Sequence, residues 1–451
     1  MPSLDDARWR HLLDKDRREL AASWSWLVLL VLLGPLVGHA FVTAVDSYAE
    51  VSGGPGGPAA LAQGLSPLDG IVVPTFGAYA IAVTLLFPFV AIRLVSSEKQ
   101  SGSLKLLLQS RSSLGTMLVV KLLVVVGAWL LAWVPGVAAL ALWRGYGGHL
   151  AGAEVSAVLL GHLLRAILTC ALAIAAASLT DNAATAAVAT LAVTLGSWAL
   201  DFIAPVRGGL ALAVDAYTPE SALRVFEAGE IRLAIVFVTL VLAVASIALA
   251  IVWLHPGRTL RARAIGTAGV IAAAVLVAWL AAHARASWDA SEDRRNSFAP
   301  ADERALAAIR DPLRISVYLA PEDPRLADLE RGVLRKLRRT MRDVDVRYVA
   351  RGSTGLFARP GEHYGEVWYA LGSRSAMSRS TTEPIVLETI YGIAGITPPT
   401  PDGAPAYPGY PLVARPRGAG LLLYLVWPLA VIASWWWTRR PRQLPALVSS
   451  S

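Results

Sequence analysis

The side chains that could carry chemistry are few and are not spaced as a catalytic site. The seven histidines are scattered, no His-Glu-x-x-His pair occurs, and Cys170 is the only cysteine. This pattern argues against a zinc protease and excludes a Cys-x-x-Cys redox pair. The sequence also lacks the Gly-x-x-x-x-Gly-Lys-Ser/Thr loop that binds nucleotides and the Gly-x-Ser-x-Gly elbow of hydrolases. We therefore predict that the chain is not an enzyme and has no catalytic, cofactor-binding or metal-binding residues of its own.

Two charged residues inside apolar segments stand apart from this pattern. Arg165 lies near the middle of one apolar segment, with His162 one turn before it, and Asp201 lies near the end of the next segment. An arginine in the middle of a membrane helix is costly, so it should face protein or water and have a partner. Because a short turn makes the two segments antiparallel, we predict an intramembrane charge pair between Arg165 and Asp201. It could line a substrate route or act as a structural clamp, and the alternative is that Arg165 extends to the outer surface.

The composition indicates an integral membrane protein. Of the 451 residues, 55% are hydrophobic and only 16% are charged, against a usual charged share of about 25%. A soluble protein of this size could not bury so much apolar side chain, because much of any folded surface faces water. The formal net charge of +8 does not indicate nucleic-acid binding, since the basic residues lie mainly between the apolar segments.

Eight segments have about the 20 apolar residues that a helix needs to cross a bilayer. They are Trp24–Val45, Ile71–Ile92, Thr116–Trp143, Val155–Leu179, Ala183–Phe202, Ile231–Leu254, Ile265–Ala284 and Ala419–Trp437. The first is predicted to be an uncleaved anchor, because it exceeds the ~7–15 apolar residues of a signal peptide and follows a long charged lead-in. Within it, the spacing Gly34-x-x-x-Gly38 would permit close contact with another helix.

Basic residues gather in four polar regions, which all fall on one side of the membrane if every apolar segment spans it. They are Arg8, Arg10, Lys15, Arg17, Arg18, Arg93, Lys99, Lys105, Arg111, Arg258, Arg261, Arg263, Arg439, Arg440 and Arg442. The opposite loop, 46–70, has no Lys or Arg. Because cytoplasmic loops carry the excess of positive charge, both termini are predicted to lie in the cytoplasm.

Residues 285–418 form a polar stretch that this topology places outside the cytoplasm. Its predicted strands are Arg314–Ala320, Asp345–Val349 and Gly365–Leu371, with a short fourth strand near Met377. A helix capped by Asp323, with Pro324 at its first position, and a second helix around Pro384–Ile393 complete a small α/β domain. The proline-rich stretch Thr397–Gly418 is expected to be a semi-rigid tether to the last apolar segment.

The predicted fold is an all-α polytopic membrane protein of about eight transmembrane helices with a small α/β extracytoplasmic domain. The chain divides into residues 1–23, an amphipathic interfacial helix; 24–254, a six-helix membrane domain; 255–284, a cytoplasmic loop and the seventh helix; 285–418, the α/β domain with its tether; and 419–451, the eighth helix and a basic cytoplasmic tail.

The lead-in is predicted to form an amphipathic helix. It begins with a capping-box-like Ser3-x-x-Asp6. Its apolar residues are Trp9, Leu12, Leu13 and Leu20, which we expect on one face, with the Arg and Asp residues on the other. Such a helix could lie in the membrane interface, and the alternative is a solvated basic tail that only enforces orientation.

The connection after the second apolar segment is predicted to contain a short, partly apolar helix. The chain bends at Gly102 and continues with Leu104, Leu107 and Leu108 on one face. An apolar helix face between two spans is a natural docking site for a cytosolic subunit, and a plain loop is the alternative.

The full pattern of this connection is Glu98-x-x-x-Gly102-Ser103-Leu104-x-x-Leu107-Leu108-x-Ser110, with Lys121 following where the chain re-enters the membrane. It resembles the permease subunits of type-2 ABC exporters over roughly Leu4–Leu254. In that family the connection is the coupling helix, which receives force from the ATPase. The resemblance therefore implies an ATPase-coupling element made of Glu98, Gly102, Ser103, Leu104, Leu107 and Leu108, in which Glu98 caps or pairs where the element begins.

A second group of motifs lies in the polar stretch. It comprises Asp293-Arg-Arg-Asn296-Ser-Phe298, Asp311-Pro-Leu, Val317-Tyr-Leu-Ala-Pro-Glu-Asp-Pro324 and Tyr364-Gly-Glu-Val-Trp-Tyr369. These motifs are similar to the extracytoplasmic domain of gliding-motility-type ABC auxiliary proteins, whose order of elements is thioredoxin-like. Ala320–Pro324 stands where a thioredoxin has its cysteines, so no redox role is implied. Permease and auxiliary parts are often separate chains in that system, whereas here they would be fused and the auxiliary part shortened.

The two resemblances together imply the membrane-spanning permease subunit of an ABC transporter, an exporter, in the bacterial cytoplasmic membrane. Its implied partners are the lipid bilayer, a separate ATPase subunit that binds ATP and Mg²⁺, and a second copy or a paired permease, with no nucleic acid. The alternative is a non-transporting membrane scaffold or sensor with an extracytoplasmic binding domain. The sequence does not indicate the substrate.

Overall fold

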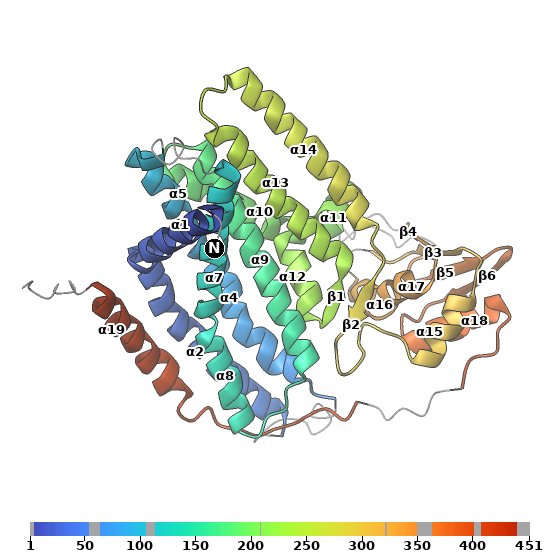
Figure 1. Ribbon diagram of the computed structural model, residues 1–451. Coiled ribbons are helices and arrows are strands. Elements are labelled where there is room, and N and C mark those ends of the chain that lie inside the picture. Colours follow the sequence, from blue (N-terminus) through green and yellow to red (C-terminus); the bar gives the residue numbers. More distant parts are fainter. Residues whose placement is uncertain are drawn as a thin grey trace, which may run out of the picture.

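The computed structural model describes residues 4–53, 64–104, 113–207, 209–320, 323–349, 363–400 and 407–439. Within these ranges the chain is mostly helical and has eight helices that are long and apolar enough to cross a membrane (Figure 1). They span Trp24–Val51, Leu68–Gln100, Leu114–Gly145, Gly152–Leu179, Ala183–Ala204, Leu233–Leu254, Leu260–Ala282 and Leu421–Arg439. Each coincides with one of the eight predicted apolar segments, so the prediction of eight candidate spans is confirmed.

Proline interrupts two of these candidate spans, because it cannot donate the hydrogen bond that continues a helix. Pro88 lies at the start of α5 and Pro135 at the start of α8. The helices of the membrane part are α1 (Leu4–Ala21), α2 (Trp24–Val51), the π-helical turn η1 (Leu68–Val72), α4 (Val73–Leu85), α5 (Phe87–Gln100), α7 (Leu114–Ala132), α8 (Val134–Gly145), α9 (Gly152–Leu179), α10 (Ala183–Arg207), α11 (Gly209–Asp215), α12 (Pro219–Glu227), α13 (Leu233–Leu254), α14 (Leu260–Ala282), η3 (Leu421–Val426) and α19 (Trp427–Arg439).

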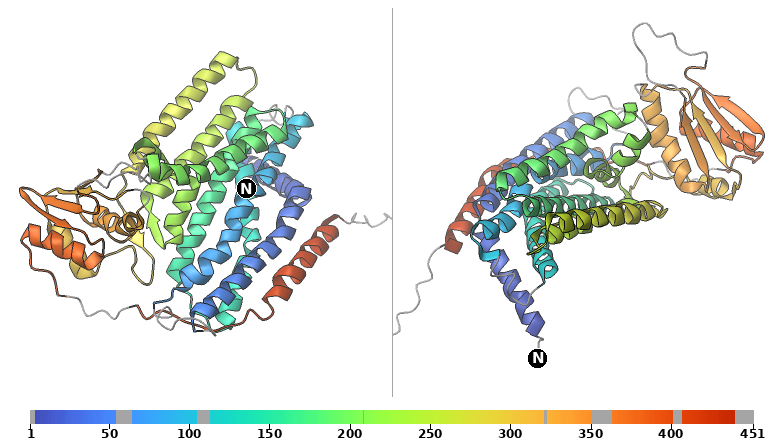
Figure 2. Two further views of the ribbon diagram at one scale, coloured as in Figure 1. Left: turned by 180° about the vertical axis from the view of Figure 1, so that it is seen from behind. Right: turned by 90° about the horizontal axis from the view of Figure 1, so that it is seen from above.

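Helix α9 is the centre of the bundle. It is the most buried of the eight candidate spans and packs against α13, α5, α12 and α10. The seventh and eighth spans lie at opposite edges: α14 packs on α13, and α19 packs on α2, as two views show (Figures 1 and 2). Neither α14 nor α19 has a buried residue. The bundle is therefore built by the first six spans, with the last two attached to its sides.

Several long-range contacts place the basic regions at one end of this bundle. Lys99, at the end of α5, donates hydrogen bonds to the carbonyls of Ala177 and Ser178 at the end of α9 and to that of Thr180 just beyond it, the last at 2.6 Å. Arg439, at the end of α19, donates to the carbonyl of Ala22 at 2.6 Å. The side chain of Ile251, near the end of α13, lies beside Gly115 at the start of α7. This grouping agrees with the predicted placement of the basic regions on one side of the membrane.

The Gly34-x-x-x-Gly38 spacing marks a real helix contact. A Cβ at Gly34 would lie 2.4 Å from Cδ1 of Trp427, and one at Gly38 would lie 2.9 Å from Cβ of Leu423. The indole of Trp427 also donates a hydrogen bond to the carbonyl of Leu30 at 2.8 Å. The eighth candidate span therefore packs closely on the first candidate span at the two glycines, which have no side chains. The predicted close contact is confirmed.

Replacing Gly34 with leucine should detach α19 from α2, because no side chain fits against Trp427 and the adjacent backbone. Overfilling a close contact costs about 1–3 kcal/mol. We expect the midpoint of thermal unfolding in detergent to fall. Gly127→Leu is the matched control, since a Cβ at Gly127 in α7 meets no atom within 4 Å. Equal effects of the two substitutions would show that the α2–α19 contact does not contribute to stability.

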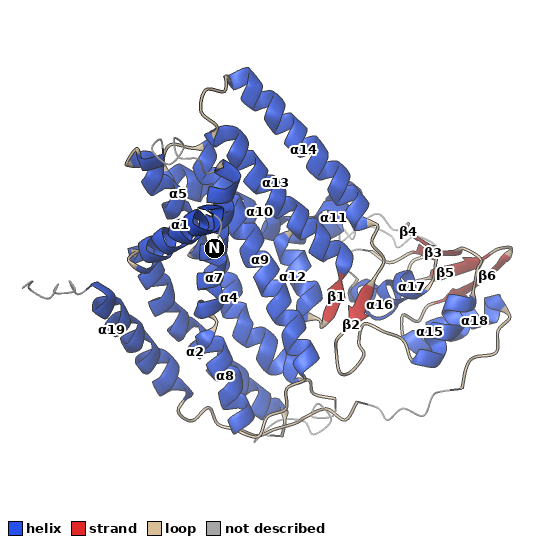
Figure 3. Ribbon diagram, viewed as in Figure 1, coloured by secondary structure: helices blue, strands red, loops and turns tan. Residues whose placement is uncertain are grey.

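The polar stretch forms a separate α/β domain, which we define as residues 287–396. Its strands are β3 (Leu313–Val317), β4 (Val344–Tyr348), β5 (Val367–Leu371) and β6 (Arg374–Ser378). Its helices are α15 (Pro300–Ala308), α16 (Pro324–Leu329), the π-helical turn η2 (Glu330–Leu334), α17 (Arg335–Thr340) and α18 (Glu383–Ala394). The sheet order is β4-β3-β5-β6, with β3 and β4 parallel and the other neighbours antiparallel (Figure 3). The predicted strands, the helix capped by Asp323 and the later helix are all present.

One face of this sheet forms the core of the domain with the helices. Alternate residues of β3, among them Ile315, and of β5, among them Tyr369, are fully buried against α16, η2 and α18. The strands β1 (Glu230–Arg232) and β2 (Ser287–Asp289) pair antiparallel and join the domain to the beginning of α13.

A compact turn after β2 fixes this junction. Asp289 accepts hydrogen bonds from Ser291, Asn296 and Ser297, while the Asn296 side chain donates to the carbonyl of Ala228 at 2.8 Å. Although burial acts in the opposite direction, these hydrogen bonds hold the pKa of Asp289 below its usual range. The Asp293–Phe298 motif therefore belongs to the joint between the α/β domain and the bundle.

Candidate functional site

A buried network of charges lies where the second candidate span ends. Nζ of Lys121, on α7, is 2.9 Å from Oε1 of Glu98, on α5, and 3.1 Å from Oδ1 of Asp16, on α1. All three side chains are only 3% exposed. A charge removed from water in this way is tolerated only with partners of opposite charge, so the network ties three helices together.

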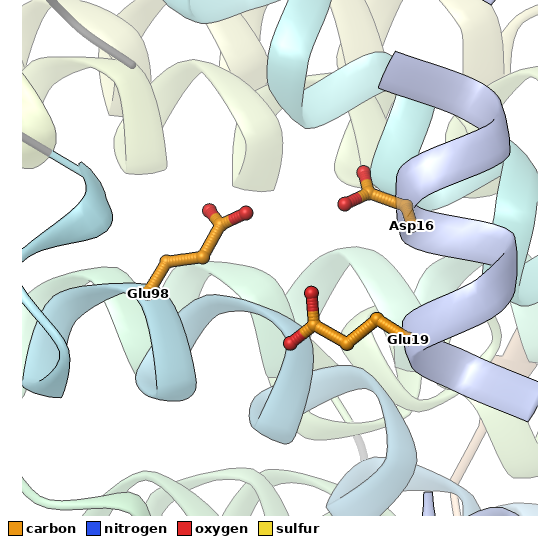
Figure 4. A group of neighbouring side chains, drawn as sticks. All are labelled: Asp16, Glu19 and Glu98. Atoms are coloured by element: carbon orange, nitrogen blue, oxygen red, sulfur yellow. The ribbon is translucent and has the colours of Figure 1, made fainter. Parts of the chain in front are cut away.

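Two further residues of α1 complete the network at its exposed side. Lys15 forms an ion pair with Glu98, and Glu19 accepts a hydrogen bond from the hydroxyl of Ser97 at 2.7 Å. Figure 4 shows Asp16 and Glu19 projecting from α1 toward Glu98. Burial raises the pKa of Asp16, and the ammonium group of Lys121 acts against that rise.

The three carboxylates of this network have oxygens within 4.8 Å of one another, which is close enough for metal ligands. However, the ammonium groups of Lys15 and Lys121 already supply positive charge to Glu98 and Asp16. We therefore interpret the cluster as a structural ion network and not as a metal site.

The position of Asp16 differs from the sequence expectation. Asp16 was expected on the polar face of the lead-in helix, but it is buried and lies between Leu12 and Leu20, which pack against the bundle. The spacing Leu12, Asp16, Leu20 is i, i+4, i+8, which puts all three on one helix face. This spacing could have revealed that Asp16 is buried, whereas nothing in the sequence indicated Lys121 as its partner.

The element that resembles a coupling helix follows directly. Gly102 has φ of +75°, a backbone conformation that only glycine adopts without strain, so the predicted bend at this residue is confirmed. The hydroxyl of Ser103 lies 2.9 Å from that of Ser101. Leu104 is partly buried and packs against the bundle core. Leu107, Leu108 and Ser110 lie outside the described residues.

The predicted pair between Arg165 and Asp201 is wrong. Nη1 of Arg165 lies 2.8 Å from Oε2 of Glu220, and its Nη2 donates to the hydroxyl of Thr84 at 2.9 Å. Asp201 instead pairs with Arg224, with 2.7 Å between Nη2 and Oδ2. The predicted pair was based only on the depths of residues within the apolar segments. The counter-ion of Arg165 comes instead from the chain between α10 and α13.

That intervening chain folds back against α9. Phe226, on α12, packs where Gly161 of α9 leaves no side chain: a Cβ at Gly161 would lie 2.6 Å from Cβ of Phe226. Helix α12 thereby brings Glu220 to Arg165, and it brings Oε1 of Glu227 to 3.8 Å from Nε2 of the fully buried His162. The amphipathic sequence of α12, which begins at Pro219 after the cap Thr218, was the signal that could have indicated a packed helix.

Removing one partner of the Arg165–Glu220 pair should destabilise the protein more than removing both. Arg165→Leu alone leaves Glu220 without its partner, and an unpaired charge in such surroundings costs about 2 kcal/mol or more. The double variant Arg165→Leu with Glu220→Leu should recover part of this loss in thermal unfolding. Combining Arg165→Leu with Asp201→Leu should give additive losses. Recovery with Asp201→Leu and not with Glu220→Leu would contradict the observed pairing.

Glu227 should make stability depend on pH. Burial, followed by the charge of Glu220, raises the pKa of Glu227 from 4.5 to about 7, while Arg165 and Arg224 act in the opposite direction. Between these two values the folded protein keeps a proton that the unfolded chain has lost, so this residue's contribution to stability falls as pH rises. The stability of Glu227→Gln relative to wild type should therefore increase from pH 4.5 to 7. A constant difference across this range, measured by thermal unfolding, would contradict the assignment.

Comparison with known proteins does not place this chain in a family. No protein-family model matches it, and no curated protein and no solved structure matches it either. Its function therefore has to be argued from its own residues.

Proposed function

We propose that this chain is the membrane-spanning permease subunit of an ABC exporter, driven by a separate ATPase subunit. The observation that carries the proposal is the element from Glu98 to Leu104. Glu98 is anchored by a buried ion pair with Lys121 and by a second ion pair with the half-exposed Lys15, and Gly102 then turns the chain through a left-handed conformation. A force applied to the short apolar helix predicted after Gly102 would pass through Glu98 to α1, α5 and α7 together.

The lead-in helix fits this role. It is fixed to the bundle by Asp16 and Leu20, beside the connection that would receive the ATPase. Because the basic regions share this end of the bundle, it is the end we assign to the cytoplasm of a bacterial cell, with both termini there. The ATPase would bind ATP and Mg²⁺, and the permease would act as a homodimer or with a paired permease.

The α/β domain supports the same assignment from the other end of the molecule. A parallel β3–β4 pair, followed by antiparallel β5 and β6 in the order β4-β3-β5-β6, supports a thioredoxin-like domain. We place it outside the cytoplasm. The alternative function, a membrane scaffold or sensor, rests on this domain alone and would leave the Glu98 network without a purpose beyond stability.

Co-purification tests the proposal. The chain, expressed with an ATPase encoded beside it that has a nucleotide-binding loop, should bring that subunit through affinity and size-exclusion steps as a stable complex. Deletion of residues 287–396 should leave the complex intact, because that domain lies at the opposite end of the bundle. Purification of this chain free of any ATPase, from cells that produce both proteins, would favour the scaffold.

A further inference from the structure

A pocket of about 360 Å³ opens on the side of the bundle, between α4, α9, α10 and the start of α12. Its polar lining consists of Thr84, Arg165, Thr194 and Glu220, which come from four different helices. Its volume falls within the usual range for small-molecule sites, which combine an apolar wall with a few convergent polar groups.

The polar lining has unused hydrogen-bonding capacity. Arg165 is 8% exposed, and its Nη1 is close to Glu220 but not aligned with any acceptor as a hydrogen bond among the described residues. Glu220 is 20% exposed at its side chain, so its carboxylate is accessible from the pocket. Guanidinium groups bind phosphate oxygens well, so an anionic group in the pocket would meet the exposed part of the Arg165 guanidinium, although Nη1 itself is buried beside Glu220.

The apolar lining faces outward from two candidate spans. Ile81 on α4 and Trp198 on α10 are each 52% exposed, and Leu85 is 44% exposed. Side chains at these positions would touch acyl chains if α4 and α10 cross a bilayer. The pocket thus joins an ion pair to a surface that is suited to lipid.

The paired charges select the kind of head group. A purely anionic ligand would be repelled by Glu220 and a purely cationic one by Arg165, whereas a ligand with both charges can satisfy both. We propose that this pocket binds a phospholipid whose head group carries a phosphate and an ammonium group, with its acyl chains along Ile81, Leu85 and Trp198. The inference that this lipid is the cargo of the exporter rests on the proposed function. Binding of the lipid to the pocket does not require an ATPase.

Lipid binding to the full-length, delipidated protein tests the proposal. Native mass spectrometry, with phosphatidylethanolamine and phosphatidylglycerol added in equal amounts, should show retention of phosphatidylethanolamine. Glu220→Gln removes the partner of the ammonium group, so it should weaken retention of phosphatidylethanolamine about tenfold and shift the preference to phosphatidylglycerol. An unchanged preference in Glu220→Gln, or no preference in wild type, would overturn the proposal.

Two further arms keep the test decisive if Glu220→Gln fails to fold. Trp198→Ala leaves the ion pair intact and should weaken retention, whereas Trp279→Ala, which removes a similarly exposed tryptophan from α14, should not. Glycerophosphoethanolamine, which has the head group without acyl chains, should not displace the lipid. Equal effects of the two tryptophan variants, or displacement by the soluble head group, would overturn the proposal. These measurements use no ATPase, so their failure is distinct from a failure of co-purification.

Discussion

Replacing Lys121 with methionine should destabilise the protein by about 3–5 kcal/mol, the usual cost of leaving a buried charge without its partner. The substitution removes the ammonium group shared by Asp16 and Glu98, both of which are 3% exposed at their side chains. Lys15 would then be the only ammonium group within ion-pair distance of these two carboxylates among the described residues. Thermal unfolding in detergent would measure the loss, and faster proteolysis of residues 4–21 would show that α1 has been released.

Two comparisons separate this effect from a general loss of positive charge. The triple variant Asp16→Asn, Glu98→Gln and Lys121→Met removes all three buried charges and should recover much of the stability. Arg17→Met breaks an exposed pair with Asp14 on the same helix and should cost less than about 1 kcal/mol. A Lys121→Met protein as stable as Arg17→Met would mean that the network does not hold α1 in place.

The second large effect concerns the proposed ATPase partner. Changing Leu104 and Leu107 to aspartate should abolish association with the proposed ATPase. Burying a leucine contributes on the order of 1.5–3 kcal/mol, and a carboxylate would oppose burial of Leu104, which packs partly against the bundle core, and of Leu107 in the proposed interface. Membrane insertion should remain, since the second and third candidate spans of the described residues end at Gln100 and begin at Leu114. Co-purification measures the first result and the yield of folded protein measures the second.

A matched control places two aspartates at the other end of the molecule. Ile385 and Val413 are 45% and 62% exposed, and both belong to the region that we assign to the outside. The double variant Ile385→Asp with Val413→Asp should bind the ATPase as wild type does. If Leu104→Asp with Leu107→Asp still binds normally, the coupling assignment is wrong.

The sequence predicted the elements well where one local pattern determines them. Each predicted apolar segment corresponds to a candidate span, the chain bends at Gly102 as predicted, and a helix begins at Pro324 after the cap Asp323. The glycine pair of the first candidate span also contacts another helix, as its spacing predicted. These features depend on the length of an apolar run, on backbone conformation or on caps, all of which are encoded within a few residues.

The sequence failed where a partner came from a distant part of the chain. Arg165 was correctly expected to need a counter-ion, but depth matching pointed to Asp201, whereas the folded-back helix α12 supplies Glu220. Similarly, Glu98 was expected to cap or pair, but Lys15 and Asp16 could not be anticipated as members of its network. Such pairings depend on how helices pack in three dimensions, and no local pattern of charge specifies that.

The rate of ATP hydrolysis by the partner ATPase tests the central claim most directly. The rate should be measured for the ATPase alone, for its complex with this chain in proteoliposomes, and for mixtures with the Leu104→Asp, Leu107→Asp variant. We predict that wild type changes the rate several-fold and that the variant leaves it at the value of the ATPase alone. An identical rate in all three samples would contradict the account, because a permease that receives force through Gly102–Leu104 must alter the cycle of the enzyme that drives it.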